Sequence, residues 1–251
     1  MTNKFKIFIV NLKKDKNRKQ SILNELKKQH LENFEIIEAF DGYNIKKNRL
    51  NLLTSKDEKF LNPNNTNMNS QEICCALSHI KIYKKIIKYN LEYALILEDD
   101  AVFVDNFSNN LKKFIIKNLK HEKQIMLLSE LWEFYKKPLD KEDNYEIVNV
   151  TNAVFTHSYF INRKAAETLI LFNFPIKTVA DNFIIFKIYC GIKITGLNPF
   201  LLKQDKNKFT SSIPIDNDLK KIFLFRRFIY KFKNRVLKKF KIFKSHKNLQ
   251  L

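Results

Sequence analysis

The sequence predicts an α/β fold, in which a mainly parallel sheet carries helices on both faces. Short apolar runs rich in β-branched residues alternate along the chain with longer segments whose apolar residues recur at helical spacing. This alternation is typical of strand–helix–strand units and of a sheet that is covered on both sides. With 251 residues, of which 45% are hydrophobic, the chain can bury a substantial core.

The first half of the chain contains four predicted strands and the helices that separate them. The strands are Lys6–Leu12, Phe34–Phe40, Tyr93–Leu97 and Gln124–Leu128, and the helices are Asp15–His30, Ser70–Asn90 and Phe107–Leu119. We expect Ser70 to cap its helix, with Glu72 in the first turn. Asp41-Gly42 is a turn signal after the second strand. The polar, Asn-rich segment 45–69 predicts an irregular surface excursion.

The second half continues the alternation and then changes in composition. We predict strands at Glu146–Phe155, Ser158–Ile161 and Ile192–Leu197, and helices at Arg163–Phe172 and Ala180–Tyr189. The composition changes near Pro214–Asp218. We therefore divide the chain into one α/β domain over residues 1–215 and a basic tail over residues 216–251.

The composition excludes several classes of protein. Three glycines are too few for a glycine-rich phosphate loop of the dinucleotide or Walker kind. Cys74, Cys75 and Cys190 show no metal-ligand spacing, so we expect a reducing compartment and no disulfide framework, with Cys74 and Cys75 as core residues. No segment reaches about 18 uncharged apolar residues, and the N-terminal apolar run is too short for a signal peptide, so neither is expected.

The stretch YALILEDDAVF, residues 93–103, places three consecutive carboxylates directly after an apolar strand. Ligands of open α/β sheets bind outside the carboxyl ends of the strands, where Glu98, Asp99 and Asp100 are expected. Carboxylates at such a position can converge on one hard divalent cation whose shell is completed by phosphate oxygens. The stretch therefore predicts a site for a metal ion and a nucleotide diphosphate. The alternative is a solvated turn or an acidic helix N-terminus.

Six segments in order resemble one family, the glycosyltransferases of family 25, which build lipooligosaccharide outer cores in Gram-negative bacteria. The segments are IFIVNLKKDKNR, QEICCALSH, LILEDDAVF, FTHSYFINRKAA, VADNFIIF and LNPFLLKQ, and with their spacing they span roughly Ile7 to Ser212. The resemblance implies a GT-A fold, which is a Rossmann-like α/β domain that binds a UDP-sugar. It also implies a metal cofactor, usually Mn²⁺, with Mg²⁺ as the alternative. It also implies transfer of a hexose, most often galactose, with inversion.

Residue roles follow from the same resemblance. It implies Glu98 and Asp100 as metal ligands, and it implies contacts to the donor nucleotide from Asn11, Arg18, His79, Asp99, His157 and Gln204. A guanidinium such as that of Arg18 suits a diphosphate, although a solvated helix face is the alternative for this residue. For His79 and His157 the alternative is a structural, hydrogen-bonded role.

An inverting transfer also requires a base that accepts the proton of the acceptor hydroxyl. Asp181 in VADNFIIF is the candidate that the resemblance supplies, and the alternative is that it caps the following helix. Glu130 is carried over as a second catalytic candidate. The stretch Met126–Glu130 departs from the family pattern because it lacks a basic residue expected there.

The basic tail is not part of the resemblance. The 33 residues from Leu219 to Leu251 hold 12 Lys or Arg and no acid, whereas the other 218 residues hold 34 basic and 26 acidic residues, out of a total net charge of +20. Within 219–243, Phe and Val recur at helical spacing opposite Lys and Arg. This pattern predicts an amphipathic helix that lies on an anionic membrane, here the cytoplasmic face of the bacterial inner membrane.

Two functions of different classes follow from these patterns. The first is an enzyme that transfers a hexose from a UDP-sugar to a lipooligosaccharide acceptor, located in the cytoplasm at the membrane surface. The alternative is a non-catalytic basic protein whose tail binds nucleic acid or an anionic membrane. We favour the enzyme and expect no nucleic-acid partner, because the apolar stripe of the tail is continuous and requires burial.

Overall fold

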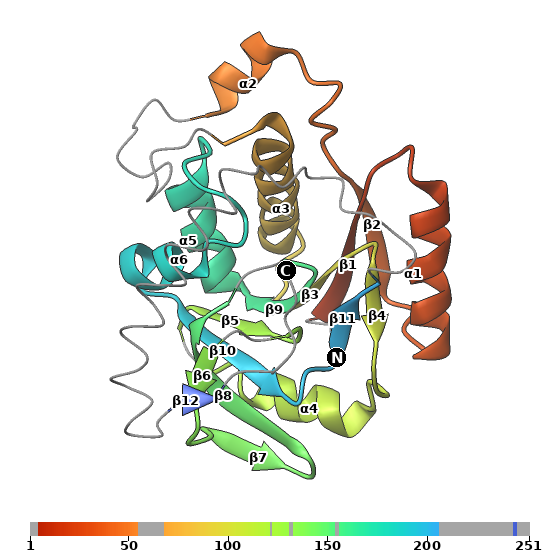
Figure 1. Cartoon of the computed structure of the whole chain (residues 1–251), viewed down its shortest axis with the longest axis vertical. Helices are drawn as coiled ribbons and strands as arrows, with labels where there is room; N and C mark the ends of the chain where they lie inside the picture. The colour runs from red at the N-terminus through yellow and green to blue at the C-terminus, as the bar shows by residue number, and fades with distance from the viewer. Residues whose placement is uncertain are drawn as a thin grey trace.

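A ten-stranded sheet forms the middle of the part of the chain that the computed structural model describes, residues 5–54, 68–120, 122–130, 133–153, 156–205 and 243–244 (Figure 1). The strands that position the site are β1 (Phe5–Asn11), β2 (Phe34–Glu38), β3 (Tyr93–Glu98), β5 (Gln124–Leu127), β9 (Ser158–Asn162) and β10 (Lys193–Asn198). Their order is β2-β1-β3-β9-β5-β10. Five of them run in the same direction, because only β9 pairs antiparallel with both of its neighbours, β3 and β5.

The sheet extends beyond β10 through short antiparallel strands. These are β8 (Tyr145–Asn152), β6 (Glu133–Tyr135), β7 (Asp140–Glu142) and β12 (Phe243–Lys244). A separate two-stranded sheet joins β4 (Ala101–Phe103) to β11 (Leu202–Gln204), with Ala101 opposite Gln204. This small sheet brings the end of β11 back to the turn that follows β3.

Helices cover both faces of the sheet, as the sequence predicts (Figure 1). The helices α3 (Ser70–Lys88), α5 (Arg163–Asn173) and α6 (Phe183–Cys190) pack on one face, and α1 (Lys16–Lys28) and α4 (Asn109–Lys117) pack on the other. Alternate residues of each strand face the two cores, so that Phe8 and Ile96 join α3 whereas Ile9 and Leu97 join α1 and α4. The predicted fold class is therefore confirmed.

Two predictions about segment 45–69 and its end are wrong. A short helix, α2 (Lys47–Leu53), lies where the sequence indicated irregular structure. The cap of α3 is Asn69 and not Ser70. The Asn69 side chain accepts from the Glu72 backbone N–H at 2.9 Å, and the Glu72 carboxylate accepts from the Asn69 N–H at 2.9 Å. This reciprocal pair satisfies two backbone donors that a cap at Ser70 would leave open.

The prediction for the tail is wrong at its last residue. Phe243, which we placed at the end of the amphipathic helix, lies in β12 and pairs with Tyr135 of β6. An edge strand has unpaired backbone groups that such a segment can satisfy. The rest of the predicted helix and the boundary at residue 215 lie outside the described residues. Among the helices that the structure describes, none has the length and apolar character needed to span a membrane.

Candidate functional site

The site is built where β1 and β3 end side by side. Val10 of β1 is in register with Glu98 of β3, so Asn11 lies beside Asp99 in the turn after β3. The Asn11 amide donates to Asp99 Oδ2 at 2.7 Å and to the backbone carbonyl of Asp15 at 3.1 Å. Asn11 is therefore a bridge between the acidic turn and the start of α1.

Arg18, in the first turn of α1, is the positive partner of two of the three carboxylates. Its Nε donates to Asp99 Oδ1 at 2.6 Å, and its Nη2 lies 2.5 Å from Asp99 Oδ1 and 2.9 Å from Asp100 Oδ2. Asp99 and Asp100 are buried, with exposed fractions of 5% and 4%. Burial raises the pKa of Asp99 to about 6, although the guanidinium of Arg18 and the amide of Asn11 act in the opposite direction.

Asp100 has one carboxylate oxygen that no described residue contacts by a hydrogen bond. Its Oδ2 accepts from Gln204 Nε2 at 2.9 Å as well as from Arg18, and its backbone carbonyl accepts from the Asp205 N–H at 2.9 Å. Oδ1 is buried and has no hydrogen-bond partner among the described residues. A buried, unpaired carboxylate oxygen is costly, so this atom is suited to receive a cation or a donor from a ligand.

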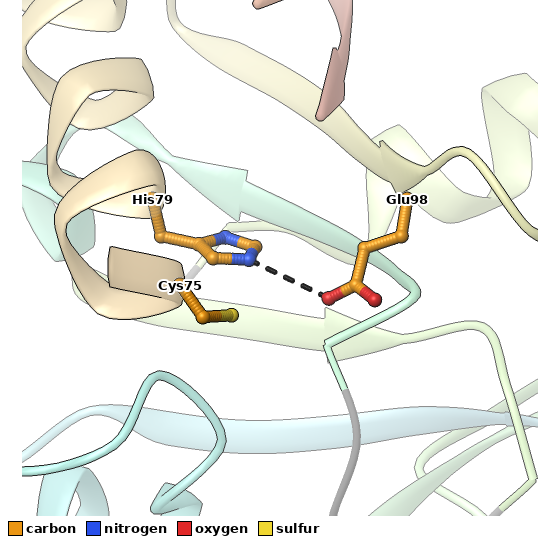
Figure 2. Close-up of side chains that lie close together, drawn as sticks. All are labelled: Cys75, His79 and Glu98. Atoms are coloured by element: carbon orange, nitrogen blue, oxygen red, sulfur yellow. Dashed lines mark ion pairs between the residues drawn. The ribbon is translucent and has the colours of Figure 1, made fainter. Parts of the chain in front are cut away.

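The Glu98 side chain points toward His79 and Cys75 of α3 (Figure 2). Its Oε1 lies 3.6 Å from His79 Nε2 and accepts a hydrogen bond from the Thr156 hydroxyl. Cys75, one helical turn before His79, points into the same space (Figure 2). Burial alone would raise the pKa of Glu98, but the nearby His79 ring, the hydrogen bond from Thr156 and the positive charge that His157 can carry hold the pKa below its usual value.

His79 is held in place from its other side. Its Nδ1 lies 2.7 Å from the Tyr159 hydroxyl, which lies 2.8 Å from the Tyr83 hydroxyl. All three side chains are almost fully buried, and the rings of His79 and Tyr159 are stacked. The ring orientation that directs Nε2 toward Glu98 is therefore fixed by a polar network within the core of α3 and β9.

The remaining predicted residues lie near the same edge of the sheet. His157 directly precedes β9, is buried, and accepts from the Glu98 N–H through its backbone carbonyl at 3.0 Å. Glu130 follows the carboxyl end of β5, which points the same way as β3. Burial raises the pKa of the Cys75 thiol, and the negative charges of Glu98 and Asp181 add to this, so Asp181 lies near Cys75.

The alternative structural role for Asp181 is contradicted. The cap of α6 is Asn182, whose side chain accepts from the Ile185 N–H at 3.4 Å, and α6 begins at Phe183 rather than at Ala180. Asp181 contributes a backbone carbonyl to the turn, where it accepts from the Phe183 N–H at 2.8 Å. Its carboxylate is thus not the capping group of this helix.

Sequence reasoning missed two members of the site, Cys75 and Thr156. We assigned Cys74 and Cys75 to the core, and neither is in a disulfide. Cys74 is buried in the core, but Cys75 is only half-buried and lies with His79 and Glu98. The signal was present, because Cys75 and His79 are four residues apart on one helix and so lie on the same face. Thr156 was missed because nothing in its local sequence distinguishes it.

The fold and the strand-end carboxylates define an α/β protein that binds its ligand at the carboxyl edge of a sheet. The chain belongs to glycosyltransferase family 25: residues 4–184 match the family described as "Glycosyltransferase family 25 (LPS biosynthesis protein)". It is 31% identical over 173 residues to human procollagen galactosyltransferase 2, a match that covers 65% of this chain and 27% of the relative. The chain therefore spans about a quarter of that relative.

Two further proteins show the range of the similarity. A provisionally named glycosyltransferase of Haemophilus influenzae is 25% identical over 226 residues, covering 84% of this chain and 76% of the relative. The procollagen lysyl hydroxylase and glycosyltransferase of Acanthamoeba polyphaga mimivirus is 27% identical over 241 residues, covering 82% of this chain and 25% of the relative. Because these two matches cover 84% and 82% of the chain, the similarity extends beyond residue 184, where the family match ends.

Proposed function

We propose that this protein transfers a hexose, with galactose as the proposed sugar, from a UDP-sugar to a lipooligosaccharide outer-core acceptor. The proposed transfer inverts the anomeric centre and uses Mn²⁺ or Mg²⁺. Membership of family 25 supports glycosyl transfer, and the family description supports lipopolysaccharide synthesis. The name of the human relative supports galactose as the sugar. The observation that carries the proposal is the buried Oδ1 of Asp100, which lies on the carboxylate that pairs with Arg18 and has no hydrogen-bond partner among the residues that the structure describes.

The residues of the acidic turn fit a hard divalent cation. Such ions take carboxylate oxygens, and Asp100 has one oxygen held by Arg18 and Gln204 and one without a hydrogen-bond partner in the described part of the chain. Glu98 is the second predicted ligand. Its Oε1 faces His79 and Thr156, and its side chain is 25% exposed. When bound, the metal would neutralise negative charge that grows on the departing diphosphate.

The side chains around the acidic turn have separate tasks in this proposal. The hydrogen bond from Asn11 to Asp99 joins the end of β1 to the acidic turn. It would fix the position of the backbone that the nucleotide contacts. Arg18 offers a planar guanidinium that can exchange a carboxylate for a phosphate oxygen, because both accept from the same fork of donors. Gln204 holds Asp100 from the opposite side through the β4–β11 pair.

Asp181 is the proposed base. Within hydrogen-bond reach of an acceptor hydroxyl, its carboxylate takes the proton as the hydroxyl oxygen attacks the anomeric carbon and the bond to the diphosphate breaks. Two observations support this role. Asp181 lies near Cys75, and the cap of α6 is Asn182, so the Asp181 carboxylate is not used as the cap. Glu130, at the same sheet edge, is the second candidate.

The location of the enzyme is proposed from the sequence alone. Residues 219–243 combine an apolar stripe with Lys and Arg, so we propose that they hold the protein at the cytoplasmic face of an anionic inner membrane. That position would give access to a lipid-linked acceptor. Binding of the full chain to anionic and to neutral vesicles tests this step, and equal binding to both would contradict it.

The test of the function is UDP release from a panel of UDP-sugars, with and without Mn²⁺, in the presence of a truncated lipooligosaccharide acceptor. We expect metal-dependent release from one sugar. Asp100→Asn should abolish release while the thermal unfolding midpoint stays near that of the wild type. Asp143→Asn is the matched control, because Asp143 is exposed and has a positive φ of 52° that Asn tolerates. Normal turnover by Asp100→Asn would refute the proposal.

A further inference from the structure

Three different metal-ligating side chains converge on one side of the acidic turn. The Cys75 sulfur, a ring nitrogen of His79 and a carboxylate oxygen of Glu98 all lie within 4.8 Å of one another. Cys75 and His79 are one turn apart on α3, and Glu98 ends β3, so the cluster is held by two rigid elements (Figure 2). Arg18, Asp99 and Asp100 form a separate ion-paired group.

The hydrogen bonds of His79 leave one ring nitrogen directed into this cluster. Nδ1 is occupied by the Tyr159 hydroxyl, and His79 is 1% exposed. Nε2 is buried and has no hydrogen-bond partner among the described residues, and its nearest charged group is Glu98 at 3.6 Å. If Nδ1 carries the proton and donates it to Tyr159, the Nε2 lone pair faces a carboxylate. In that tautomer, a cation between the lone pair and the carboxylate would satisfy both groups.

We propose that Cys75, His79 and Glu98 form a site for a borderline divalent transition metal, with Zn²⁺ as the preferred ion. Sulfur and imidazole donors favour Zn²⁺ over Mn²⁺ and Mg²⁺, which prefer all-oxygen ligand sets. Binding replaces the thiol proton of Cys75, which is released to solvent, by a metal–sulfur bond. The site shares Glu98 with the metal site of the proposed function, but Asp100 and Arg18 take no part in it, so variants of Asp100 separate the two proposals.

The observed geometry is close to that of a loaded site. Zn²⁺ bonds of roughly 2.0–2.3 Å in a tetrahedron place ligand atoms about 3.3–3.6 Å apart. The separation of 3.6 Å between His79 Nε2 and Glu98 Oε1 already matches this value. The sulfur, within 4.8 Å of both, needs to move by at most about 1.5 Å, which a rotation of the Cys75 side chain supplies.

The surroundings provide orientation and access. The contact of His79 Nδ1 with Tyr159 is the kind of outer interaction that orients a metal-ligating histidine. Cys75 is half-buried and the Glu98 side chain is 25% exposed, so an ion can enter from solvent. Three protein ligands leave a fourth position for water or for an oxygen of a bound ligand, the arrangement found in catalytic rather than structural zinc sites.

The test is a Co²⁺ titration of the full chain after treatment with a chelator, in a thiol-free reductant. We expect a near-ultraviolet thiolate-to-Co²⁺ charge-transfer band that saturates at one equivalent and is displaced by Zn²⁺. Cys75→Ser should abolish this band. His79→Gln and Glu98→Gln should each weaken Co²⁺ binding at least about tenfold, the lower end of what is lost when even an outer partner of a metal ligand is removed.

Two control variants make the result specific. Cys74→Ser removes the neighbouring thiol, which lies outside the cluster, and should leave the band unchanged. Asp100→Asn should keep the band even though it abolishes UDP release, so that the two proposals fail separately. Far-ultraviolet circular dichroism shows whether each variant is folded. The proposal is overturned if the folded wild-type protein gives no charge-transfer band, or if the band persists in Cys75→Ser.

Discussion

Arg18 and Asp99 form a close ion pair across 81 residues of sequence, with Arg18 Nε donating to Asp99 Oδ1 at 2.6 Å. The pair joins the first turn of α1 to the turn after β3. Since Arg18 also reaches Asp100, one guanidinium neutralises two buried carboxylates. Asp99 and Asp100 can therefore lie next to each other in a buried turn, because the Arg18 guanidinium of α1 pairs with both.

Removal of this cation should destabilise the fold. Arg18→Gln leaves Asp99 and Asp100 buried without their charge partner, and we expect the free energy of unfolding to fall by about 2–4 kcal/mol. Lys19→Gln removes one exposed positive charge from the same helix and should change it by less than about 0.5 kcal/mol. Urea denaturation of the two variants without added metal measures both values. Equal stabilities would show that the pair contributes nothing.

Much of the fold could be predicted because it depends on patterns that are local in sequence. The strand that ends at Glu98 and the helix from Ser70 have clear periodicity, and both lie where predicted. The antiparallel insertion of β9 between β3 and β5 could not be predicted, because strand order is decided by packing between distant segments. Strands of three residues such as β4 and β11 are too short to show any period.

The candidate site could be predicted only in part for the same reason. The position of Glu98, Asp99 and Asp100 at a strand end followed from the sequence. The sequence did not predict that Asp100 pairs with Arg18 whereas Glu98 lies beside His79. This division depends on the direction that each side chain takes in the folded turn. Cys75 was overlooked because its spacing from His79 becomes meaningful only when Glu98 is known to face the same helix turn.

The hydroxyl of Tyr159 should be worth more to stability than that of Tyr83. Tyr159→Phe leaves two buried groups without their partner, His79 Nδ1 and the Tyr83 hydroxyl, and should cost about 2–4 kcal/mol. Tyr83→Phe leaves Tyr159 bonded to His79 and should cost about 1 kcal/mol or less. Chemical denaturation of both variants gives the comparison. A larger loss in Tyr83→Phe would contradict the order of the network.

The start of α3 provides a test of the corrected cap. Asn69→Ala removes the side-chain acceptor of the Glu72 N–H, and the expected loss of stability is about 1 kcal/mol. Ser70→Ala alters the position that the sequence pointed to, and it should change stability by less than about 0.5 kcal/mol. Thermal unfolding of both variants at one pH decides between the two positions. A greater loss in Ser70→Ala would restore the original assignment.

The edge of the sheet at β2 should give a pH-dependent contribution to stability. Glu35 lies 2.8 Å from Lys85 Nζ and 3.1 Å from Lys6 Nζ. Partial burial acts to raise the pKa of Glu35, but the hydrogen bonds and charges of the two lysines outweigh it and hold the pKa below the ordinary value of 4.5. A lowered carboxyl pKa stabilises the folded state above the unfolded pKa, and this stabilisation is lost as the pH falls through the folded pKa.

Glu35→Gln should therefore reduce stability near neutral pH by at most about 1 kcal/mol, because the pair is partly solvated. The difference from the wild type should shrink below the ordinary pKa of 4.5 and vanish once Glu35 is protonated in the folded protein. Glu32→Gln, at an exposed position just before β2, should show no such dependence. Urea denaturation over a series of pH values measures the difference. If the effect of Glu35→Gln stays constant as the pH falls, the lysines do not act on Glu35 through its charge.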